Sequence, residues 1–337
     1  MRTEEFVNVA HRRCPRLAGH AFRALLVFLL AVTSLPAEES LQSAVNRLMR
    51  ERRGAVIASD PRTGRILALW NARGAFEDAY PPGSTAKLVE AVALLEEKKI
   101  SGSDRIHCRR VPELLGESHR CSHPVMGFAF DLKSALAYSC NYFFAAESVR
   151  LTSSSLLHWY TRFGFGTPVD VAFTAANPGD VRVPDDVSAK ARAALGEDTV
   201  LVTPAQMLLA YSAIAPGGKV FRLWRSGSPP KKIPRVVRKL ALRPETLEMI
   251  NSGLEECVRS GTGQGAAVAG LRVAGKTGTA ALGLPGRTHA WFVGYAPADA
   301  PEIALVVFLE QGTGARDAAP LAGEILRHYF ALKSRKP

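Results

Sequence analysis

Ser84 and Lys87 are the first residues whose types and spacing could do covalent chemistry. They lie in Pro82-Gly83-Ser84-Thr85-Ala86-Lys87, at the start of a run free of glycine and proline, residues 84–98. At this spacing on a helix, two side chains lie on the same face. A lysine can take the proton of a serine hydroxyl when desolvation or a neighbouring positive charge lowers its pKa. The pair predicts acyl transfer through Ser84, although Ser-x-x-Lys also arises by chance as a helix cap followed by a solvated lysine.

Ser139 and Asn141 form a second candidate pair, 55 residues after Ser84. The serine hydroxyl could relay protons, and the asparagine amide could hold a substrate carbonyl. Serine and asparagine also favour the turns that end helices, so a structural role is the alternative for this pair alone.

Lys276-Thr277-Gly278-Thr279 is the third candidate and the most specific of the three. The lysine supplies positive charge, the two threonine hydroxyls can bind a carboxylate, and Gly278 would let a substrate backbone lie against the strand. The rival is a phosphate loop, because Gly270-x4-Gly275-Lys276-Thr277 matches its bare pattern. That loop must lead into a helix, whereas residues 271–274 resemble a strand and residues 278–286 are broken by glycine. Nucleotide binding is therefore disfavoured.

The elements around these residues indicate a sheet built from both ends of the chain with helices between. The leading strands form a hairpin, residues 55–58 and 66–70, with a turn at Asp60-Pro61-Arg62-Thr63-Gly64, and three more strands follow late, residues 271–281, 290–296 and 303–309. Helices are predicted at residues 39–52, 84–98, 131–150 with a break near 139–141, from Thr203-Pro204 to 216–218, and 317–332. Strands at both ends and helices between them predict an α+β fold with terminal helices on one sheet face.

The order of the three motifs resembles the active-serine motifs shared by penicillin-binding proteins and serine β-lactamases. The chain is most similar to the transpeptidase domain of penicillin-binding proteins, over about residues 54 to 330. Further segments of similar sequence carry this resemblance: Pro81 to Thr85, Ala137 to Phe144, Val202 to Met207, Gly261-Thr262-Gly263, Ala274 to Ala280 and His289 to Pro297.

The resemblance implies a five-stranded antiparallel sheet beside an all-helical subdomain, inserted at about residues 85–255, with the site between them. It implies that Ser84 attacks the penultimate D-alanine carbonyl of a peptidoglycan stem peptide. Further implied roles are Lys87 as acylation base, Ser139 and Lys276 as proton relay, Asn141 in substrate orientation, Thr277 and Thr279 in carboxylate binding, and the N–H groups of Ser84 and Thr279 as oxyanion hole. β-Lactams would acylate Ser84, and no cofactor is implied.

Three functions remain open under this resemblance. The first is a D,D-transpeptidase. The second is a hydrolase, either a D,D-carboxypeptidase or a β-lactamase; the chain lacks a glutamate motif of class A β-lactamases and has Ser-x-Asn where class D enzymes carry Ser-x-Val. The third is a non-catalytic β-lactam-binding module. Only about fifteen residues separate the leader from the first strand, so we expect no glycosyltransferase or pedestal domain, and a separate cell-wall synthesis protein could be the partner.

Residues 1–37 have the character of a secretory signal or a membrane anchor. Arg12, Arg13, Arg16 and Arg23 precede a short apolar run, residues 24–32. The run is short for a bilayer span, which needs ~20 residues. We therefore expect export to a periplasmic or other extracytoplasmic space, with residues 24–35 as an anchor if the leader is retained. Residues 38–337 would form the catalytic domain.

The formal net charge is +12, and part of it lies in an expected loop containing Lys231, Lys232, Arg235, Arg238 and Lys239. In an exported protein, anionic lipid headgroups or an acidic wall polymer fit such a patch better than nucleic acid does. A solvated loop is the alternative.

Cys108 and Cys121 lie 13 residues apart, and His107, His119 and His123 lie beside them. Their spacing matches no familiar zinc pattern, so we assign no metal ligands and favour a disulfide, with two buried thiols as the alternative. Cys257 is expected in the core.

Overall fold

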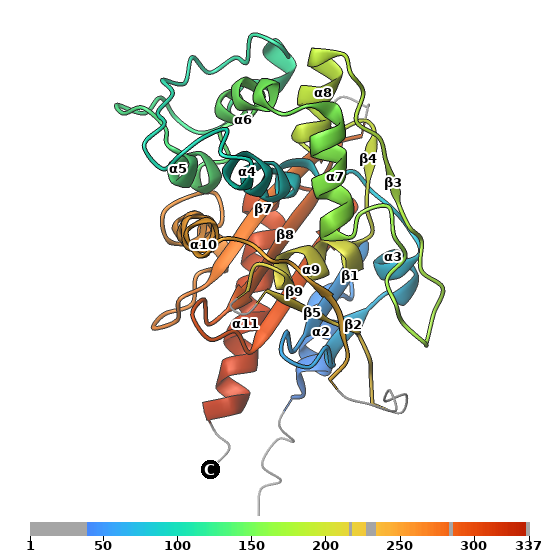
Figure 1. Ribbon diagram of the computed structural model, residues 1–337. Coiled ribbons are helices and arrows are strands. Elements are labelled where there is room, and N and C mark those ends of the chain that lie inside the picture. Colours follow the sequence, from blue (N-terminus) through green and yellow to red (C-terminus); the bar gives the residue numbers. More distant parts are fainter. Residues whose placement is uncertain (1–38, 216–217, 227–233, 283–285, 335–337) are drawn as a thin grey trace, which may run out of the picture. The chain divides into compact units, whose positions relative to one another are not determined.

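The computed structural model describes residues 39–215, 218–226, 234–282 and 286–334, and Figure 1 traces their path. Five strands form an antiparallel sheet in the order β2-β1-β9-β8-β7. The bounds of these strands are β1 Gly54–Ser59, β2 Ile66–Trp70, β7 Ala274–Ala281, β8 Thr288–Ala296 and β9 Ile303–Leu309. The two ends of the described chain thus pair along β1 and β9, with Val56 opposite Val307.

The residues of the central strand β9 are buried on both faces of the sheet, which explains its unbroken apolar run. Residues such as Val307 pack with the terminal helices α2 (Leu41–Met49) and α11 (Ala319–Ser334). Alternate residues such as Val306 pack on the opposite face with the helical subdomain. This period of two divides the domain into two cores, one on each side of the sheet.

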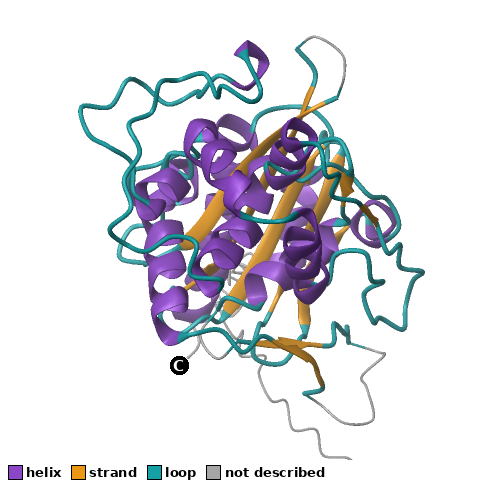
Figure 2. Cartoon of the chain, turned by 45° about the horizontal axis from the view of Figure 1, so that its top comes forward, coloured by secondary structure: helices purple, strands orange, loops and turns teal. Residues whose placement is uncertain are grey.

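The helical subdomain covers the second face of the sheet, as Figure 2 shows. Its elements are α3 Ala72–Phe76, α4 Lys87–Glu96, α5 Leu132–Ala137, α6 Asn141–Glu147, α7 Ser153–Phe163, α8 Val187–Ala194, α9 Pro204–Ser212 and α10 Pro244–Arg259. Two short antiparallel pairs accompany them, β3 (Asp180–Val181) with β4 (Val200–Leu201) and β5 (Lys219–Phe221) with β6 (Val236–Lys239).

The α+β fold and the five-stranded sheet are confirmed, with differences at the ends of elements. The predicted helix 84–98 begins at Lys87, because Gly83–Ala86 form a tighter 3₁₀ turn, η1. Strand β7 begins at Ala274 rather than at 271. The helix at Pro204 begins as predicted, with a reciprocal capping box between Thr203 and Gln206, and ends earlier, at Ser212.

The expected basic loop is wrong for Arg238 and Lys239, which lie in strand β6, whereas Arg235 lies just before that strand. Arg235 pairs with Asp170, and Arg238 Nη1 donates to the Phe163 carbonyl. Burial lowers the pKa of Arg238 from its ordinary value. Lys231 and Lys232 lie outside the described residues, as does the predicted leader, residues 1–37. Among the described helices, none has the length and apolar character needed to cross a membrane.

Candidate active site

Ser84 lies in the 3₁₀ turn η1, and Lys87 is the first residue of α4. Residues three apart on a 3₁₀ turn lie nearly above one another, so the turn brings the two side chains to one side. Ser84 is partly exposed, whereas Lys87 is fully buried. The element thus presents a hydroxyl at the surface and keeps an amine beneath it.

The Lys87 amine is held by the turn between α5 and α6. Its Nζ lies 2.6 Å from Asn141 Oδ1, 3.0 Å from the Ser139 carbonyl oxygen and 3.2 Å from Ser139 Oγ. The structure therefore brings together the first two predicted motifs through Lys87 and Ser139, which are 52 residues apart in sequence.

The pKa of Lys87 is lowered to about 7, first by desolvation and then by the charge of Lys276. Both causes disfavour the ammonium form. These are the two effects that the sequence-based interpretation required of a lysine base. At neutral pH a large fraction of Lys87 is a free amine, able to accept a proton.

Ser139 is positioned by an unusual backbone conformation. Helix α5 ends at Ala137, Ser139 has a φ of 56°, and Cys140 then caps α6 by accepting a hydrogen bond from the Phe143 N–H. A left-handed φ in a residue other than glycine is uncommon and costs energy, so the surrounding contacts must hold it. The break directs both the carbonyl and the hydroxyl of Ser139 to Lys87.

The third motif lies on β7, which is one of the two edge strands of the sheet. Lys276 is fully buried, its Nζ donates to the Thr277 carbonyl at 3.1 Å, and burial lowers its pKa. Its strand setting does not fit a phosphate loop, which must lead into a helix. The relay between Ser139 and Lys276 stays a prediction.

Two glycines allow β7 to lie against the Ser84 turn. A Cβ added to Gly278 would lie 2.7 Å from the Pro82 carbonyl oxygen and 3.0 Å from Thr85 Cγ2. A Cβ on Gly83 would lie 2.9 Å from the Thr279 carbonyl oxygen. The two glycines thus let the Ser84 turn pack directly on β7, which brings the backbones of Ser84 and Thr279 close together. The role of Gly278 in substrate binding stays a prediction.

The two threonines of the third motif have separate partners. Thr277 Oγ1 lies 2.5 Å from Thr262 Oγ1, and Thr279 Oγ1 accepts a hydrogen bond from the Gly314 N–H at 3.0 Å. In that bond the Thr279 hydroxyl acts only as an acceptor, so its proton remains available for donation to another group. Thr262 belongs to the Gly261-Thr262-Gly263 segment, which had been assigned no role from sequence.

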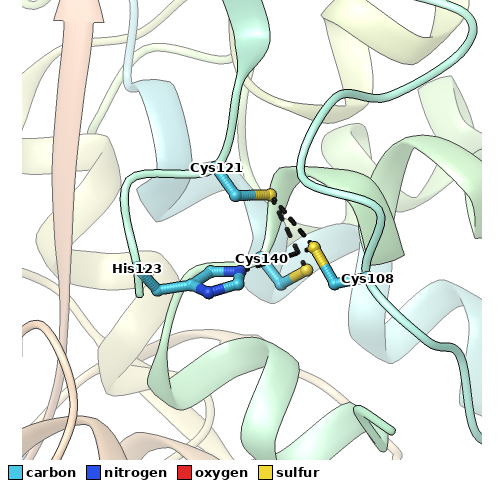
Figure 3. A group of neighbouring side chains, drawn as sticks. All are labelled: Cys108, Cys121, His123 and Cys140. Atoms are coloured by element: carbon cyan, nitrogen blue, oxygen red, sulfur yellow. Dashed lines mark hydrogen bonds between the residues drawn. The ribbon is translucent and has the colours of Figure 1, made fainter. Parts of the chain in front are cut away.

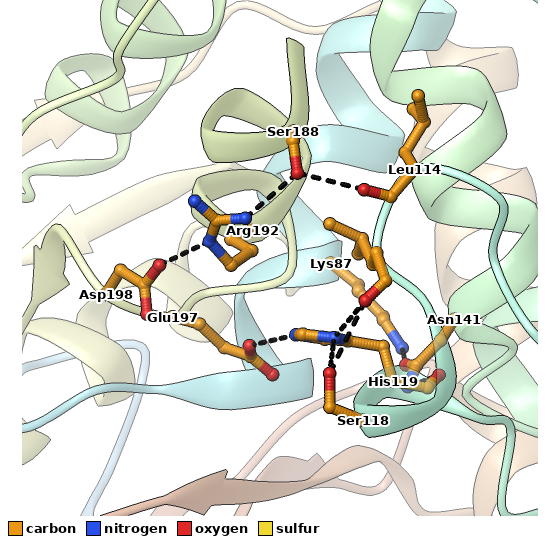
Figure 4. A network of polar contacts seen from close by, with 10 residues as sticks. Lys87, Leu114, Ser118, His119, Asn141, Ser188, Arg192, Glu197 and Asp198 are labelled. Atoms are coloured by element: carbon orange, nitrogen blue, oxygen red, sulfur yellow. Dashed lines mark hydrogen bonds and ion pairs between the residues drawn. The ribbon is translucent and has the colours of Figure 1, made fainter. Parts of the chain in front are cut away.

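A network of polar contacts surrounds the site and includes residues that sequence reasoning missed (Figure 4). Asn141 Nδ2 donates to the His119 carbonyl at 3.0 Å, and His119 Nε2 lies 2.7 Å from Glu197 Oε2. The Glu197 contact raises the pKa of His119 from its ordinary value. The residue before Glu197, Gly196, accepts the Gly83 N–H at 2.9 Å. The contacts thus lead from Lys87 through Asn141, His119 and Glu197 to the Ser84 turn, and they join segments that are far apart in sequence.

The favoured disulfide between Cys108 and Cys121 is wrong. Their sulfurs lie 3.6 Å apart, whereas a disulfide bond is about 2.05 Å long. The two thiols lie next to the side chains of Cys140 and His123, as Figure 3 shows. The burial of Cys257 in the core is confirmed.

Comparison with known proteins identifies a family for most of the chain. The model of the penicillin binding protein transpeptidase domain matches residues 54–328. Stage V sporulation protein D of Bacillus subtilis is 30% identical over 83% of this chain and 49% of its own length. Peptidoglycan D,D-transpeptidase MrdA of Acinetobacter baumannii is 25% identical over 90% of this chain and 54% of its own length. The chain spans about half the length of these relatives.

The fold has counterparts among solved structures. Penicillin-binding protein A from Mycobacterium tuberculosis, solved as a ceftriaxone acyl-enzyme complex, aligns with a TM-score of 0.75 at 24% identity, covering 86% of this chain and 77% of that one. With the family model matching more than half of the sequence, the chain belongs to the penicillin-binding protein transpeptidase domain family.

Proposed function

We propose that this protein is a serine D,D-transpeptidase that acts on D-Ala-D-Ala stem peptides of peptidoglycan. One observation carries the proposal: Lys87, three residues after the partly exposed Ser84, is fully buried with its pKa lowered to about 7. A buried lysine near neutrality is suited to activating a serine hydroxyl. The family of the chain and the names of its relatives support the same activity.

In the acylation step, Ser84 Oγ attacks the carbonyl of the penultimate D-alanine while Lys87 Nζ takes the hydroxyl proton. The tetrahedral intermediate then collapses, the peptide bond breaks, and the terminal D-alanine leaves. Its amine must gain a proton, which Ser139 can pass on from Lys87, to which it is hydrogen bonded at 3.2 Å. The positive charge of Lys276 lowers the pKa of Lys87 and so favours its neutral form.

The oxyanion is assigned to the N–H groups of Ser84 and Thr279, whose backbones are brought near each other by Gly83 and Gly278. Loss of one such donor costs about 10²–10³ in turnover in other enzymes. The terminal carboxylate of the substrate is assigned to Thr277 and Thr279. The Thr279 hydroxyl fits this role because its oxygen already accepts the Gly314 N–H and can still donate its proton.

The acyl group on Ser84 is then transferred to an amine of a second stem peptide, and Ser84 is released. β-Lactams would enter the same acylation step and remain attached, as the acyl-enzyme of the Mycobacterium tuberculosis relative illustrates. We place the catalytic domain, residues 38–337, on the outer side of the cytoplasmic membrane, with residues 1–37 as its signal or anchor. A cell-wall synthesis protein is the proposed partner, because a peptidoglycan synthase complex that coordinates polymerization and crosslinking is among the similar solved structures.

Incubation with a D-Ala-D-Ala pentapeptide and an excess of an amine acceptor tests the activity. A transpeptidase releases D-alanine and forms the new amide in matching amounts, both of which mass spectrometry detects. D-Alanine release without the new amide would instead indicate a carboxypeptidase. Neither product from wild type, with Ser84→Ala as the blank, would indicate a non-catalytic module.

A further inference from the structure

Cys108, Cys121, His123 and Cys140 place three sulfurs and one imidazole nitrogen within 4.8 Å of one another (Figure 3). The sulfur atoms of Cys108 and Cys121 lie 3.6 Å apart, and those of Cys121 and Cys140 lie 3.9 Å apart. Cys108 Sγ lies 3.7 Å from His123 Nε2. A tetrahedral Zn²⁺ with Zn–S bonds of about 2.3 Å would hold sulfurs about 3.8 Å apart and a sulfur and a nitrogen about 3.6 Å apart. These three separations match a tetrahedral zinc ligand set, and the other three are no longer than 4.8 Å.

The surroundings of these side chains support a metal site independently of the distances. His123 Nδ1 lies 2.7 Å from the Pro124 carbonyl, so Nδ1 carries the proton and Nε2 presents its lone pair to the sulfurs. Each sulfur also accepts a backbone N–H: Arg110 to Cys108 at 3.3 Å, Tyr142 to Cys121 at 3.3 Å and Phe143 to Cys140 at 3.4 Å. Such bonds stabilise metal-bound thiolates.

We infer that Cys108, Cys121, His123 and Cys140 bind one Zn²⁺ as a closed structural site. Three thiolates and one imidazole are an established structural donor set for zinc and leave no coordination position for a substrate. The assignment departs from the absence of a metal site expected from sequence. That expectation considered Cys108, Cys121 and the histidines beside them and omitted Cys140, which follows 19 residues after Cys121.

The zinc site would connect the loop at residues 106–130 to the catalytic turn, which is the turn between α5 and α6 that contains Ser139. The loop leaves and rejoins the fold at an antiparallel bridge between Ile106 and Phe130, and it contributes three of the four ligands. The fourth, Cys140, lies between Ser139 and Asn141, the two residues that hold the Lys87 amine. The same loop supplies the His119 carbonyl that accepts the Asn141 amide. Binding of zinc would therefore set the position of both partners of Lys87.

Metal content tests the site without reference to catalysis. The full chain, purified under reducing conditions with its affinity tag removed, should contain one zinc per chain by mass spectrometry. Cys121→Ser and His123→Ala should lose it. Cys257→Ala and His107→Ala should retain it, because Cys257 lies on α10 outside the cluster and His107 is an exposed neighbour of Cys108. Zinc-free wild type, or an intact mass two hydrogens lower through a Cys108–Cys121 disulfide, would overturn the site.

Replacement of zinc by Co²⁺ provides a second measurement that does not need the variants to fold. Wild type should show the intense visible bands of tetrahedral Co²⁺ and a thiolate charge-transfer band in the near ultraviolet. A weak octahedral spectrum without the charge-transfer band would contradict the ligand set.

The effect on the catalytic turn rests on the proposed function and needs its own comparison. Chelator-stripped wild type should be acylated by a fluorescent penicillin about 10–100-fold more slowly than the zinc form, because small displacements of catalytic groups cost that much. Added Zn²⁺ should restore the rate. Equal rates in the two forms would overturn the link to catalysis. If the zinc form binds its metal and yet is not acylated, the proposed function fails and the metal site stands.

Discussion

Lys87 Nζ and Asn141 Oδ1 lie 2.6 Å apart, so the amide of the second motif accepts a hydrogen bond from the amine of the first. A neutral amide does not raise the pKa of Lys87 as a carboxylate would. Burial and the charge of Lys276 therefore lower this pKa without an opposing charge at position 141. The choice of Asn at this position thus suits a base that must be uncharged near neutral pH.

The acylation rate should depend on pH through Lys87. Its pKa is lowered to about 7, and the free amine is the active form. The second-order rate constant for acylation by a fluorescent penicillin should rise about tenfold per pH unit below 7 and level off above it. A rate that is constant from pH 5.5 to 9, or that still rises at pH 10, would exclude Lys87 as the base.

Asn141→Asp should move that pH profile upward. The new carboxylate would lie beside Lys87 and stabilise its ammonium form, which raises a pKa by about 1–3 units at such distances. Because half of Lys87 is a free amine at pH 7 when its pKa is about 7, acylation at that pH should fall about 5–500-fold and recover as the pH rises. Asn141→Ala provides the comparison, since it removes the amide without adding charge, and an Asp variant with the profile of the Ala variant would contradict the argument.

Gly278→Ala should damage the site through the backbone. The added methyl group would meet the Pro82 carbonyl at 2.7 Å and push β7 away from the Ser84 turn. We expect a loss of ~1–3 kcal/mol in stability and a drop in acylation of about 10²-fold. Gly127→Ala is the matched control, because nothing lies within 4 Å of its added Cβ. Equal acylation by both variants would mean that the close approach is unimportant.

Glu90→Gln should stabilise the protein, increasingly so at higher pH. Glu90 is fully buried, both of its carboxylate oxygens lack a hydrogen-bond partner among the described residues, and desolvation holds its pKa well above the ordinary value. The unfolded chain loses this proton first, so wild type loses up to ~1.4 kcal/mol per pH unit between the unfolded and folded pKa values.

Urea unfolding of wild type and Glu90→Gln at a series of pH values measures the difference. The two should have similar stabilities at acid pH and diverge above the ordinary carboxyl pKa. The exposed Glu248→Gln should show no such trend. A constant difference between Glu90→Gln and wild type would show that Glu90 does not titrate differently on folding.

The sheet and the principal site residues could be predicted from sequence because their signals are local. Strand β9 is an unbroken apolar run, and α9 begins at a threonine cap followed by proline. The order of the three motifs carried the family resemblance. The 3₁₀ turn at Ser84 could not be foreseen, because its sequence also suits the first turn of an α-helix.

The cysteine cluster could not be predicted because its ligands come from two segments of the chain. Cys108, Cys121 and His123 were visible as neighbours, but Cys140 belongs to a different motif and is brought in by the turn after α5. The spacing of Cys108 and Cys121 suggested a disulfide between them, whereas the fold brings both together with His123 and Cys140 as four potential zinc ligands. The His119–Glu197 contact was equally hidden, since 78 residues separate its partners.

Covalent labelling by penicillin is the most direct test of Ser84 as the nucleophile. Intact mass spectrometry of the full chain before and after incubation should show one added penicilloyl group, and peptide mapping should place it on Ser84. Ser84→Ala should show none under the same conditions. Equal labelling of wild type and Ser84→Ala, or a penicilloyl group mapped to another residue, would contradict the account.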